Sequence, residues 1–198
     1  MQLIKINKLK KYYGDRLILD IDKLEISDGD KIGLVGINGC GKTTLLKVIM
    51  DKNESIKIAN RVKIGYFQQD LMILNEDKSI LNNILESSSE NETFIRIVLS
   101  RFLFRESDVY KRVSVLSGGE KVRVALCKIL LSDNNLLILD EPTNYLDIQS
   151  MEALEEALKN SNKTMIIVSH DRRFIANVCN EILCFEDNTL KYYPYEYD

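Results

Sequence analysis

The chain has 198 residues, of which 45% are apolar and 29% are charged, and its formal net charge is −3. This is the composition of an ordinary globular protein, long enough for one domain with an inserted lobe. Its apolar runs are too short for direct membrane insertion, and its charge argues against broad nonspecific nucleic-acid binding. The cysteines follow no disulfide or metal-site spacing, so we expect a reducing, cytoplasmic compartment.

The first third of the chain predicts strands around a glycine-rich turn. Apolar and polar residues alternate over residues 3–6, 17–21 and 24–26, which predicts an antiparallel edge sheet with turns at 13–15 and 27–30. A buried strand at 31–35 leads into the turn. Apolar residues at helical spacing follow from Thr43 to Met50. Another strand is expected over 62–67.

The pattern changes between about residues 71 and 131. Helices are expected over 80–85 and 94–104, separated by a polar loop at 86–92. Ser117 and Glu120 have the spacing of a capping box, which predicts a helix from there to Leu131. We interpret this stretch as an inserted helical lobe, and we expect the core to comprise about residues 1–70 and 132–198.

The last third returns to strand patterns. The unbroken apolar runs at 136–139 and 165–168 are typical of strands buried on both faces of a parallel sheet. A helix is expected over 151–158, and a terminal hairpin over 182–185 and 190–193 turns at Asp187 and Asn188. The alternation of strands and helices predicts an α/β core with an α-helical insertion.

The run Gly36-Ile-Asn-Gly-Cys-Gly-Lys-Thr43 is a phosphate loop in the right context, because a buried strand precedes it and a helix follows. Its glycines let backbone N–H groups converge on phosphates at the positive end of that helix. We expect Lys42 to reach the β- and γ-phosphates and the Thr43 hydroxyl to coordinate Mg²⁺. No role is expected for the thiol of Cys40, where only the backbone matters.

Two carboxylates follow the buried run at 136–139. Asp140 ends that run at the sheet edge where nucleotides bind, so we expect it to hold Mg²⁺ directly or through water. Glu141 comes next and points elsewhere, which frees it to orient and polarise the attacking water. The alternative is that Glu141 only caps the loop together with Pro142. Its adjacency to Asp140 favours catalysis.

Three further residues are candidates for the same site. His170, the only histidine, follows a buried strand, and this position favours a hydrogen bond to the γ-phosphate or the attacking water over a structural role. Gln69 also follows a strand and is a candidate to contact Mg²⁺ and the same water, although Gln68 competes with it. Tyr13 either stacks on adenine or packs at its turn.

The run Leu116-Ser-Gly-Gly-Glu120 is hard to explain by structure alone. A capping box needs the serine and the glutamate but not two glycines, each of which costs about 1 kcal/mol of helix propensity. Close approach to the backbone by an anion at the helix N-terminus accounts for them. Because the chain's own phosphate site already has a helix, this one is expected to serve the nucleotide of a second molecule.

With these motifs together, essentially the whole chain resembles the nucleotide-binding domain of ABC ATPases. The resemblance implies an α/β fold with a phosphate-loop NTPase (RecA-like) core, an antiparallel β subdomain and an inserted α-helical lobe. It also implies Mg²⁺-dependent ATP hydrolysis by a head-to-tail dimer. In that dimer, ATP lies between the phosphate loop of one copy and the signature of the other.

The functional positions of the family map onto this sequence in four sets. The residues that bind ATP are Tyr13, Gly36, Ile37, Asn38, Gly39, Cys40, Gly41, Lys42, Thr43 and Thr44. The catalytic residues are Glu141, His170 and Gln69. The Mg²⁺ ligands are Thr43, Gln69 and Asp140. The signature that faces the partner's nucleotide is Ser117, Gly118, Gly119 and Glu120, with Asp147 in the dimer-contact loop.

Residues 141–147 and 169–174 are similar to the ABC-F branch, and residues 108–125 to the second ATPase domain of its resistance-type members. Tyr145 departs from the histidine that is frequent in the branch, which leaves the catalytic set intact. The resemblance implies a fragment of a two-domain protein that acts on the ribosome, as a translation factor or in antibiotic resistance. Its partners would be the ribosome and a second ABC domain, in the parent chain or as a homodimer.

Two alternatives to the ABC-F interpretation remain open. The first is the ATPase subunit of a membrane transporter, which a gene encoding a single such domain would favour. The second is a non-hydrolysing, ATP-dependent interaction module. That alternative fits poorly with the presence of both Glu141 and His170.

Overall fold

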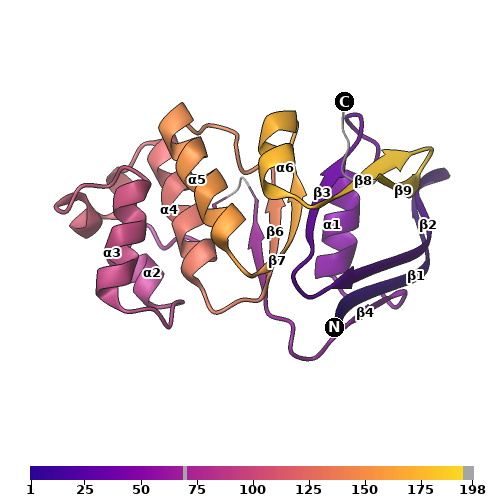
Figure 1. The fold of residues 1–198 in the computed structure, drawn as a ribbon, viewed down its shortest axis with the longest axis horizontal. Coiled ribbons are helices and arrows are strands. Elements are labelled where there is room, and N and C mark those ends of the chain that lie inside the picture. The colour runs from indigo at the N-terminus through magenta and orange to yellow at the C-terminus, as the bar shows by residue number, and fades with distance from the viewer. Residues whose placement is uncertain (69–70, 194–198) are drawn as a thin grey trace. The chain divides into compact units, whose positions relative to one another are not determined.

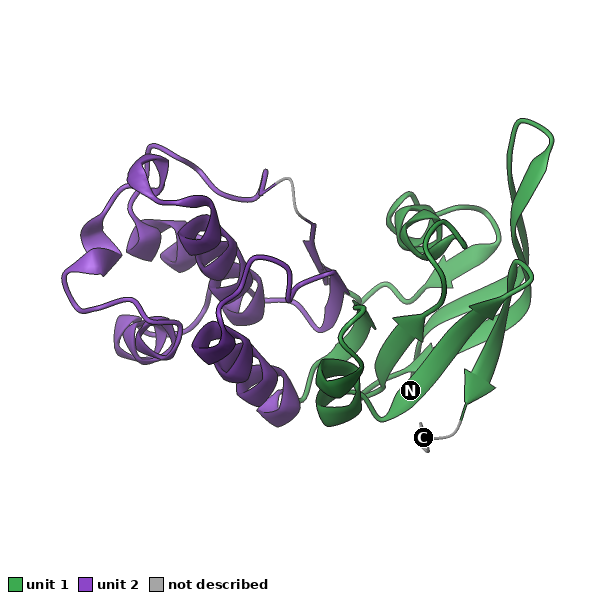
Figure 2. Cartoon of the chain, turned by 90° about the horizontal axis from the view of Figure 1, so that it is seen from above, with its two compact units in different colours: residues 1–62, 162–198 green, residues 63–161 purple. Residues whose placement is uncertain are grey.

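The computed structural model describes residues 1–68 and 71–193, which divide into two compact units (Figure 2). Unit 1 comprises Met1–Val62 and Asn162–Asp198, and unit 2 comprises Lys63–Ser161. These boundaries differ from those predicted for core and lobe, because residues 63–67 and 132–161 cluster with the helices of unit 2. Gly65 illustrates the cause: a Cβ atom there would lie 2.6 Å from Nδ2 of Asn134 and 3.2 Å from Cγ2 of Ile129, in the last turn of the helix Gly118–Leu131 of that unit.

Unit 1 contains the predicted antiparallel sheet, with strand order β2-β1-β4 (Figure 1). Strand β1 (Gln2–Tyr13) pairs with β2 (Arg16–Ser27) and with the short β4 (Ile56–Ile58). Its leucine and isoleucine side chains are buried, with Ile4 and Ile6 fully inaccessible to solvent. The sheet is more extensive than the alternation predicted. β4 was not predicted at all, because only its pairing with β1 makes three residues a strand.

Unit 1 also contains parallel strands in the order β7-β3-β8, with β9 antiparallel at the edge. Their bounds are β3 (Lys31–Val35), β7 (Thr164–Val168), β8 (Glu181–Glu186) and β9 (Thr189–Tyr193). Asp187 and Asn188 both have positive φ, at 47° and 66°, as a two-residue hairpin turn requires. This confirms the predicted terminal hairpin. The helices of unit 1 are α1 (Lys42–Met50) and α6 (Arg172–Val178), the second of which was not predicted.

Unit 2 combines a pair of parallel strands with most of the helices. Strand β5 (Ile64–Phe67) pairs with β6 (Leu136–Asp140), whose first four residues are completely buried. The helices are α2 (Ile80–Leu85), α3 (Glu92–Arg101), α4 (Gly118–Leu131) and α5 (Ile148–Asn160). Two 3₁₀ turns at Asp108–Tyr110 and Val113–Val115 lead into α4.

Side-chain caps explain where the helices of unit 2 begin. The prediction for α3 was wrong by two residues at its start and three at its end. Asn91 accepts a hydrogen bond from the N–H of Phe94, so the helix begins inside the polar run. The backbone turns left-handed at Leu103, just after the helix ends at Arg101. Asp147 caps α5 in the same way, which starts that helix three residues before the predicted position.

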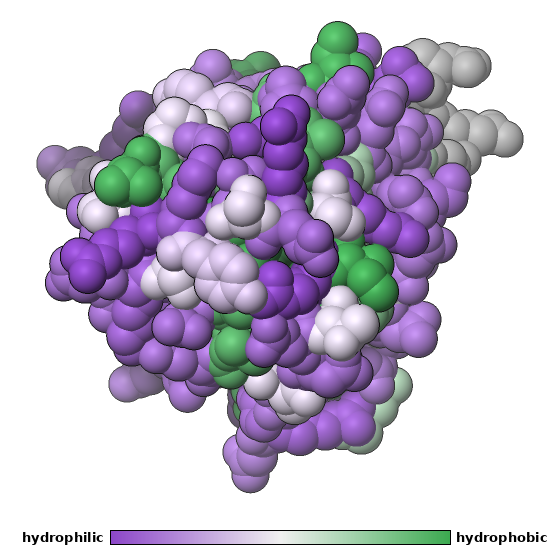
Figure 3. Space-filling model, turned by 90° about the vertical axis from the view of Figure 1, so that its left-hand side faces the viewer, coloured by the Kyte–Doolittle hydropathy of each residue, from purple (hydrophilic) through white to green (hydrophobic). Residues whose placement is uncertain are grey.

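The face of the molecule that carries α3 is mainly hydrophilic, with apolar side chains scattered across it (Figure 3). The exposed apolar residues of α3 are Phe94 and Ile97, and Ile97 directly follows Arg96 in the helix. Within residues 1–68 and 71–193, the helices are too short or too polar to cross a bilayer.

Candidate functional site

The phosphate loop lies in unit 1, between the end of β3 and the start of α1. Gly41 is the N-cap of α1 and has φ of 119°, which strongly favours glycine. A Cβ atom at Gly41 would lie 2.9 Å from Cδ2 of Leu19 and 3.3 Å from the backbone oxygen of Ile18. Strand β2 therefore packs directly against the loop at Gly41. At the tip of the loop, Ile37, Asn38 and Gly39 are exposed.

The Lys42 side chain folds back over this loop. Only 8% of the residue is exposed, and its Nζ donates hydrogen bonds to the backbone oxygens of Gly36 at 2.7 Å and Ile37 at 3.1 Å. The sulfur of Cys40 lies 4.0 Å from the same nitrogen. The loop thus holds a positive charge beside its own exposed backbone, which suits a polyphosphate. Thr43 is exposed at the first turn of α1, as a hydroxyl ligand for Mg²⁺ requires.

His170 is also in unit 1, where β7 passes into α6. The neighbouring residues fix its backbone: Ser169 Oγ accepts the N–H of Asp171 at 3.1 Å, and Asp171 Oδ1 accepts the N–H of Phe174 at 3.0 Å. The His170 residue itself is exposed. A cavity of about 620 Å³ is lined by Gly36 and Ile37 of the phosphate loop together with His170. The structure therefore brings His170 and the phosphate loop to one cavity.

Tyr13 ends strand β1 and is 57% exposed, with the ammonium of Lys11 5.9 Å from the centre of its ring. The exposed ring leaves a surface for stacking on a base. Gln69 lies outside the described residues. Its competitor Gln68 is half-buried at the end of β5. The roles of these three residues remain predictions.

The two candidate acidic residues lie in unit 2, at the end of β6. Asp140 is the last residue of the strand, and the backbone then changes hand, because Glu141 has φ of 52°. This left-handed conformation is uncommon outside glycine and costs about 1–3 kcal/mol. A hydrogen bond from the N–H of Asn144 to the backbone oxygen of Glu141, at 3.2 Å, closes the turn. The change of hand ends the strand directly after Asp140 and begins the turn at Glu141.

The signature forms the predicted capping box at the start of α4. Ser117 Oγ accepts the N–H of Glu120 at 3.3 Å, and Glu120 Oε2 accepts both the N–H and the hydroxyl of Ser117 at 2.8 Å. These two hydrogen bonds to the carboxylate hold the pKa of Glu120 below its usual value.

The two glycines of the signature are not needed for packing within unit 2. Among the described residues, no heavy atom outside the helix's own backbone lies within 4 Å of a Cβ built at Gly118. A Cβ built at Gly119 would only touch the backbone oxygen of Tyr145, at 3.4 Å, which is ordinary contact. Open space over the backbone at a helix N-terminus is what approach by an outside group requires.

Asp147 has a contact that the sequence did not reveal. Its carboxylate caps α5 through Ser150, and its Oδ2 also lies 3.3 Å from Nη1 of Arg123 on α4. These contacts, led by the N–H of Ser150, hold the pKa of Asp147 below its usual value. The Arg123 guanidinium also lies 5.2 Å from the ring centre of Phe104. Arg123 thus joins the signature helix to the dimer-contact loop, and no local sequence pattern indicates this because 24 residues separate the partners.

The capping box gives a pH-dependent prediction. Glu120→Ala should lower the free energy of unfolding by about 1 kcal/mol at pH 7, because it removes both hydrogen bonds to Ser117. Since the pKa of Glu120 is lowered in the folded protein, this stabilisation is present above its unfolded pKa and is lost as the pH falls through the folded value. The difference between the variant and the unmodified chain should therefore shrink as the pH falls below about 4.

Urea unfolding at pH 7 and pH 3 measures this difference. Glu152→Ala is the matched control, because Glu152 is exposed on α5. This substitution should leave the free energy of unfolding nearly unchanged at both pH values. A loss for Glu120→Ala that is equally large at pH 3 would show that the carboxylate's charge contributes nothing.

Comparison with known proteins places the site in context. The family described as ABC transporter matches residues 19–144. The ABC transporter F family member 5 of Arabidopsis thaliana is 38% identical over 203 residues, which cover 99% of this chain and 29% of that protein. This chain spans 29% to 35% of the length of the first three curated relatives.

Solved structures agree with the predicted fold class. An RNase-L inhibitor structure has a TM-score of 0.79 and 30% identity, covering 99% of this chain and 38% of the other. An ATP-binding cassette solved as a dimer in a post-hydrolysis state, with ADP and phosphate, also has a TM-score of 0.79, at 23% identity, and covers 99% of this chain and 100% of the other. The second likeness concerns the fold alone. Together they confirm the phosphate-loop NTPase fold.

Proposed function

Because this chain belongs to the ABC transporter family as an ATPase domain, we propose that it hydrolyses ATP as one half of a head-to-tail dimer and drives a ribosome-associated ABC-F protein. The observation that carries the dimer is the open space over the signature glycines. One chain has a phosphate loop and, separately, a second helix N-terminus whose backbone is accessible from outside. Two copies, or two such domains in one parent chain, would complete each other's sites.

Each predicted residue has a task in this mechanism. The loop amides of residues 36–44 and the ammonium of Lys42 bind the triphosphate, and Tyr13 stacks on the base. Thr43, Asp140 and Gln69 would supply the oxygen donors that Mg²⁺ prefers, and the bound ion would add positive charge at the phosphates. The partner's Ser117, Gly118 and Gly119 would close over the γ-phosphate.

The hydrolytic step depends on two residues that act on water. Glu141 accepts the proton of the attacking water, from a backbone that turns left-handed directly after Asp140. His170 donates a hydrogen bond to the γ-phosphate or to the water, from a backbone held by Ser169 and Asp171. The partner's signature adds helix N–H groups on the far side of the phosphate, where negative charge builds up.

The ribosomal role rests on the ABC-F relatives. The most direct support is that 99% of this chain matches part of an F family member. We propose a cytoplasmic two-domain parent protein whose other ABC domain pairs with this one. The parent would act on the ribosome as a translation factor or in antibiotic resistance. The alternative is the ATPase subunit of a membrane transporter, a use suggested by the family description.

Sedimentation of the parent protein separates these two functions. With Glu141→Gln in the domain and ATP present, hydrolysis is blocked, so the parent should co-sediment with ribosomes. With ADP it should stay in the supernatant. Lys42→Met, which should prevent ATP binding, is the matched control and should not sediment in either nucleotide. Recovery of the Glu141→Gln protein in the membrane fraction, with none on ribosomes, would instead favour the transporter.

A further inference from the structure

The turn that follows β6 holds two residues in the left-handed conformation. Glu141 has φ of 52° at its start, and Tyr145 has φ of 66° near its end. Left-handed backbone is unfavourable outside glycine and persists where the surrounding structure enforces it. Within the turn, the N–H of Asn144 donates to the Glu141 oxygen at 3.2 Å, and the N–H of Leu146 donates to the Thr143 oxygen at 3.3 Å. Both hydrogen bonds are long, so the turn also needs support from outside itself.

Asp147, directly after this turn, is bonded to two helices. Its Oδ1 accepts the N–H of Ser150 on α5, and its Oδ2 accepts the hydroxyl of the same serine, each at 2.9 Å. Nη1 of Arg123 on α4 lies 3.3 Å from Asp147 Oδ2 and 3.4 Å from Ser150 Oγ. Ser150 is completely buried. The far end of the turn is therefore fixed to α5 and, through Arg123, to α4.

The surroundings of Arg123 explain poorly a residue that only stabilises the fold. Its side chain is 16% exposed, and its guanidinium lies 5.2 Å from the ring centre of Phe104. Within residues 1–68 and 71–193, its Nε is buried without a hydrogen-bond partner. Burying a charged group with one N–H unsatisfied is unfavourable, whereas an apolar side chain of the same length would pack on Phe104 without that cost. The contacts of the guanidinium with Asp147 and Ser150 therefore indicate a different role.

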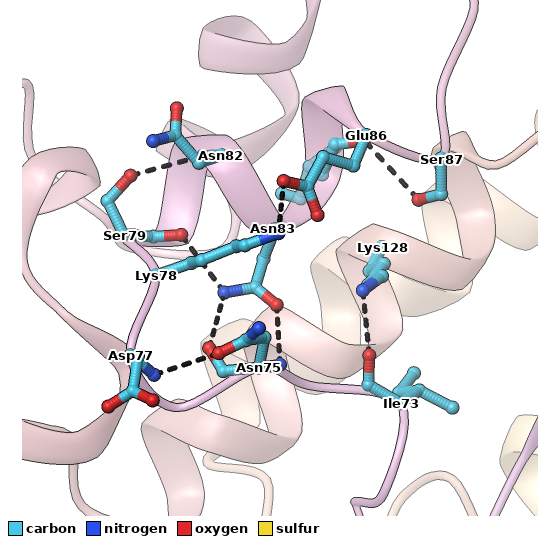
Figure 4. Close-up of polar contacts among 11 residues, drawn as sticks. Ile73, Asn75, Asp77, Lys78, Ser79, Asn82, Asn83, Glu86, Ser87 and Lys128 are labelled. Atoms are coloured by element: carbon cyan, nitrogen blue, oxygen red, sulfur yellow. Dashed lines mark hydrogen bonds and ion pairs between the residues drawn. The ribbon is translucent and has the colours of Figure 1, made fainter.

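The helix that carries Arg123 is itself held in place (Figure 4). Lys128 Nζ, further along α4, donates a hydrogen bond to the backbone oxygen of Ile73 at 2.7 Å. Two residues after Ile73, the completely buried Asn83 fixes the backbone of Asn75. Its Oδ1 accepts the Asn75 N–H at 2.8 Å, and its Nδ2 donates to the Asn75 oxygen at 2.9 Å. Arg123 thus extends from a fixed support.

We propose that Arg123 is a positioning residue for ATP hydrolysis: it holds the far end of the turn and thereby keeps the Glu141 backbone in its left-handed conformation. This rests on the proposed function, in which Glu141 takes the proton of the attacking water. Arg123 needs no contact with the nucleotide for this role. Because a small displacement of a catalytic group lowers the rate strongly, a looser turn should slow the chemical step. ATP binding should be spared, since the phosphate loop lies in unit 1.

Arg123→Met tests this role, because it keeps the length of the side chain and its packing on Phe104 but removes both hydrogen bonds. We expect kcat, measured by phosphate release from the full chain at saturating ATP, to fall about tenfold. ATP affinity from fluorescent-nucleotide titration should stay within about twofold, and the urea midpoint of unfolding within about 0.5 M. An unchanged kcat, in a protein that Glu141→Gln inactivates, would overturn the proposal alone.

Combination with Glu141→Gln distinguishes positioning from a general structural role. If Arg123 acts through Glu141, Arg123→Met should cause no further loss in the Glu141→Gln protein, because the carboxylate that it positions is already absent. Single-turnover hydrolysis measures the low residual rate. A further tenfold or so loss in that background would overturn the proposal, since Arg123 would then act independently of Glu141.

Arg123→Lys is a second variant, which also serves if the methionine variant does not fold. Lysine keeps the positive charge and can donate one hydrogen bond to Asp147, but it lacks the planar fork of the guanidinium. Its kcat should fall about threefold, and this loss should also disappear in the Glu141→Gln background. Equal rates for the lysine variant and the unmodified chain, or for the lysine and methionine variants, would contradict the role of the guanidinium.

Arg101→Met is the matched control, because Arg101 on α3 pairs with Glu156 on α5 at 3.0 Å in the same unit, away from the turn. It should leave kcat unchanged. A loss as large as that of Arg123→Met would overturn the proposal, since any lost ion pair to α5 would then slow hydrolysis. If Glu141→Gln itself leaves hydrolysis intact, the proposed function fails instead, because Glu141 is then not the base.

Discussion

Glu141→Gln should lower the rate of ATP hydrolysis by at least about 100-fold while ATP binding stays close to that of the unmodified chain. Glutamine has the shape of glutamate but cannot accept the proton of the attacking water. The backbone at this position is already left-handed, with φ of 52°, and glutamine meets it with the same kind of side chain. The variant should therefore lose chemistry and keep its structure. Phosphate release under saturating ATP measures the rate, and fluorescent-nucleotide titration measures binding.

Glu152→Gln is the control, since Glu152 is exposed on α5 and the same chemical change there should leave hydrolysis unaffected. A Glu141→Gln protein that still turns over ATP at an undiminished rate would remove Glu141 as the base. His170 or a water chain would then have to take the proton.

Lys42→Met should weaken ATP binding by at least about 100-fold, which corresponds to roughly 3 kcal/mol. The ammonium lies within the phosphate loop, where it bonds to the oxygens of Gly36 and Ile37. Methionine has a side chain of similar length but no charge and no donor. The variant should therefore lose both the electrostatic attraction to the triphosphate and the contacts that shape the loop. Isothermal titration calorimetry with Mg²⁺-ATP checks the affinity.

Lys47→Met is the matched control because it makes the same change on the same helix, at an exposed residue five positions further along. It should bind ATP normally. Equal weakening by both variants would mean that the net charge of α1, rather than the Lys42 contact, attracts the nucleotide.

The parts of the fold that were predicted well depend on local physics. The helix from Gly118 to Leu131 was predicted to the residue, because both groups of its capping box lie within four positions of each other. The turn at Asp187 and Asn188 was also predicted, since these residue types tolerate the left-handed conformation that both adopt. Buried parallel strands were recognised from their unbroken apolar runs.

The parts that were missed depend on partners far away in the sequence. Strand β4 exists because Ile56–Ile58 pairs with residues 4–6 of β1. The motifs of the candidate site were all recognisable as short runs, but the contacts that position them were not. Arg123 reaches Asp147, and Lys128 reaches Ile73, across 24 and 55 residues. Such contacts follow from the packing of whole helices, which no window of sequence contains.

The empty space above Gly118 affects how mutational data on this chain should be interpreted. A scan that scores only how much folded protein accumulates in cells should find small side chains acceptable at that position, since no described heavy atom outside the helix's own backbone lies within 4 Å of a Cβ there. A scan that scores growth dependent on the protein's activity should find that nearly all of these substitutions abolish growth. Positions that tolerate substitution in the first scan but not in the second would identify surfaces that are needed only for association with a second domain.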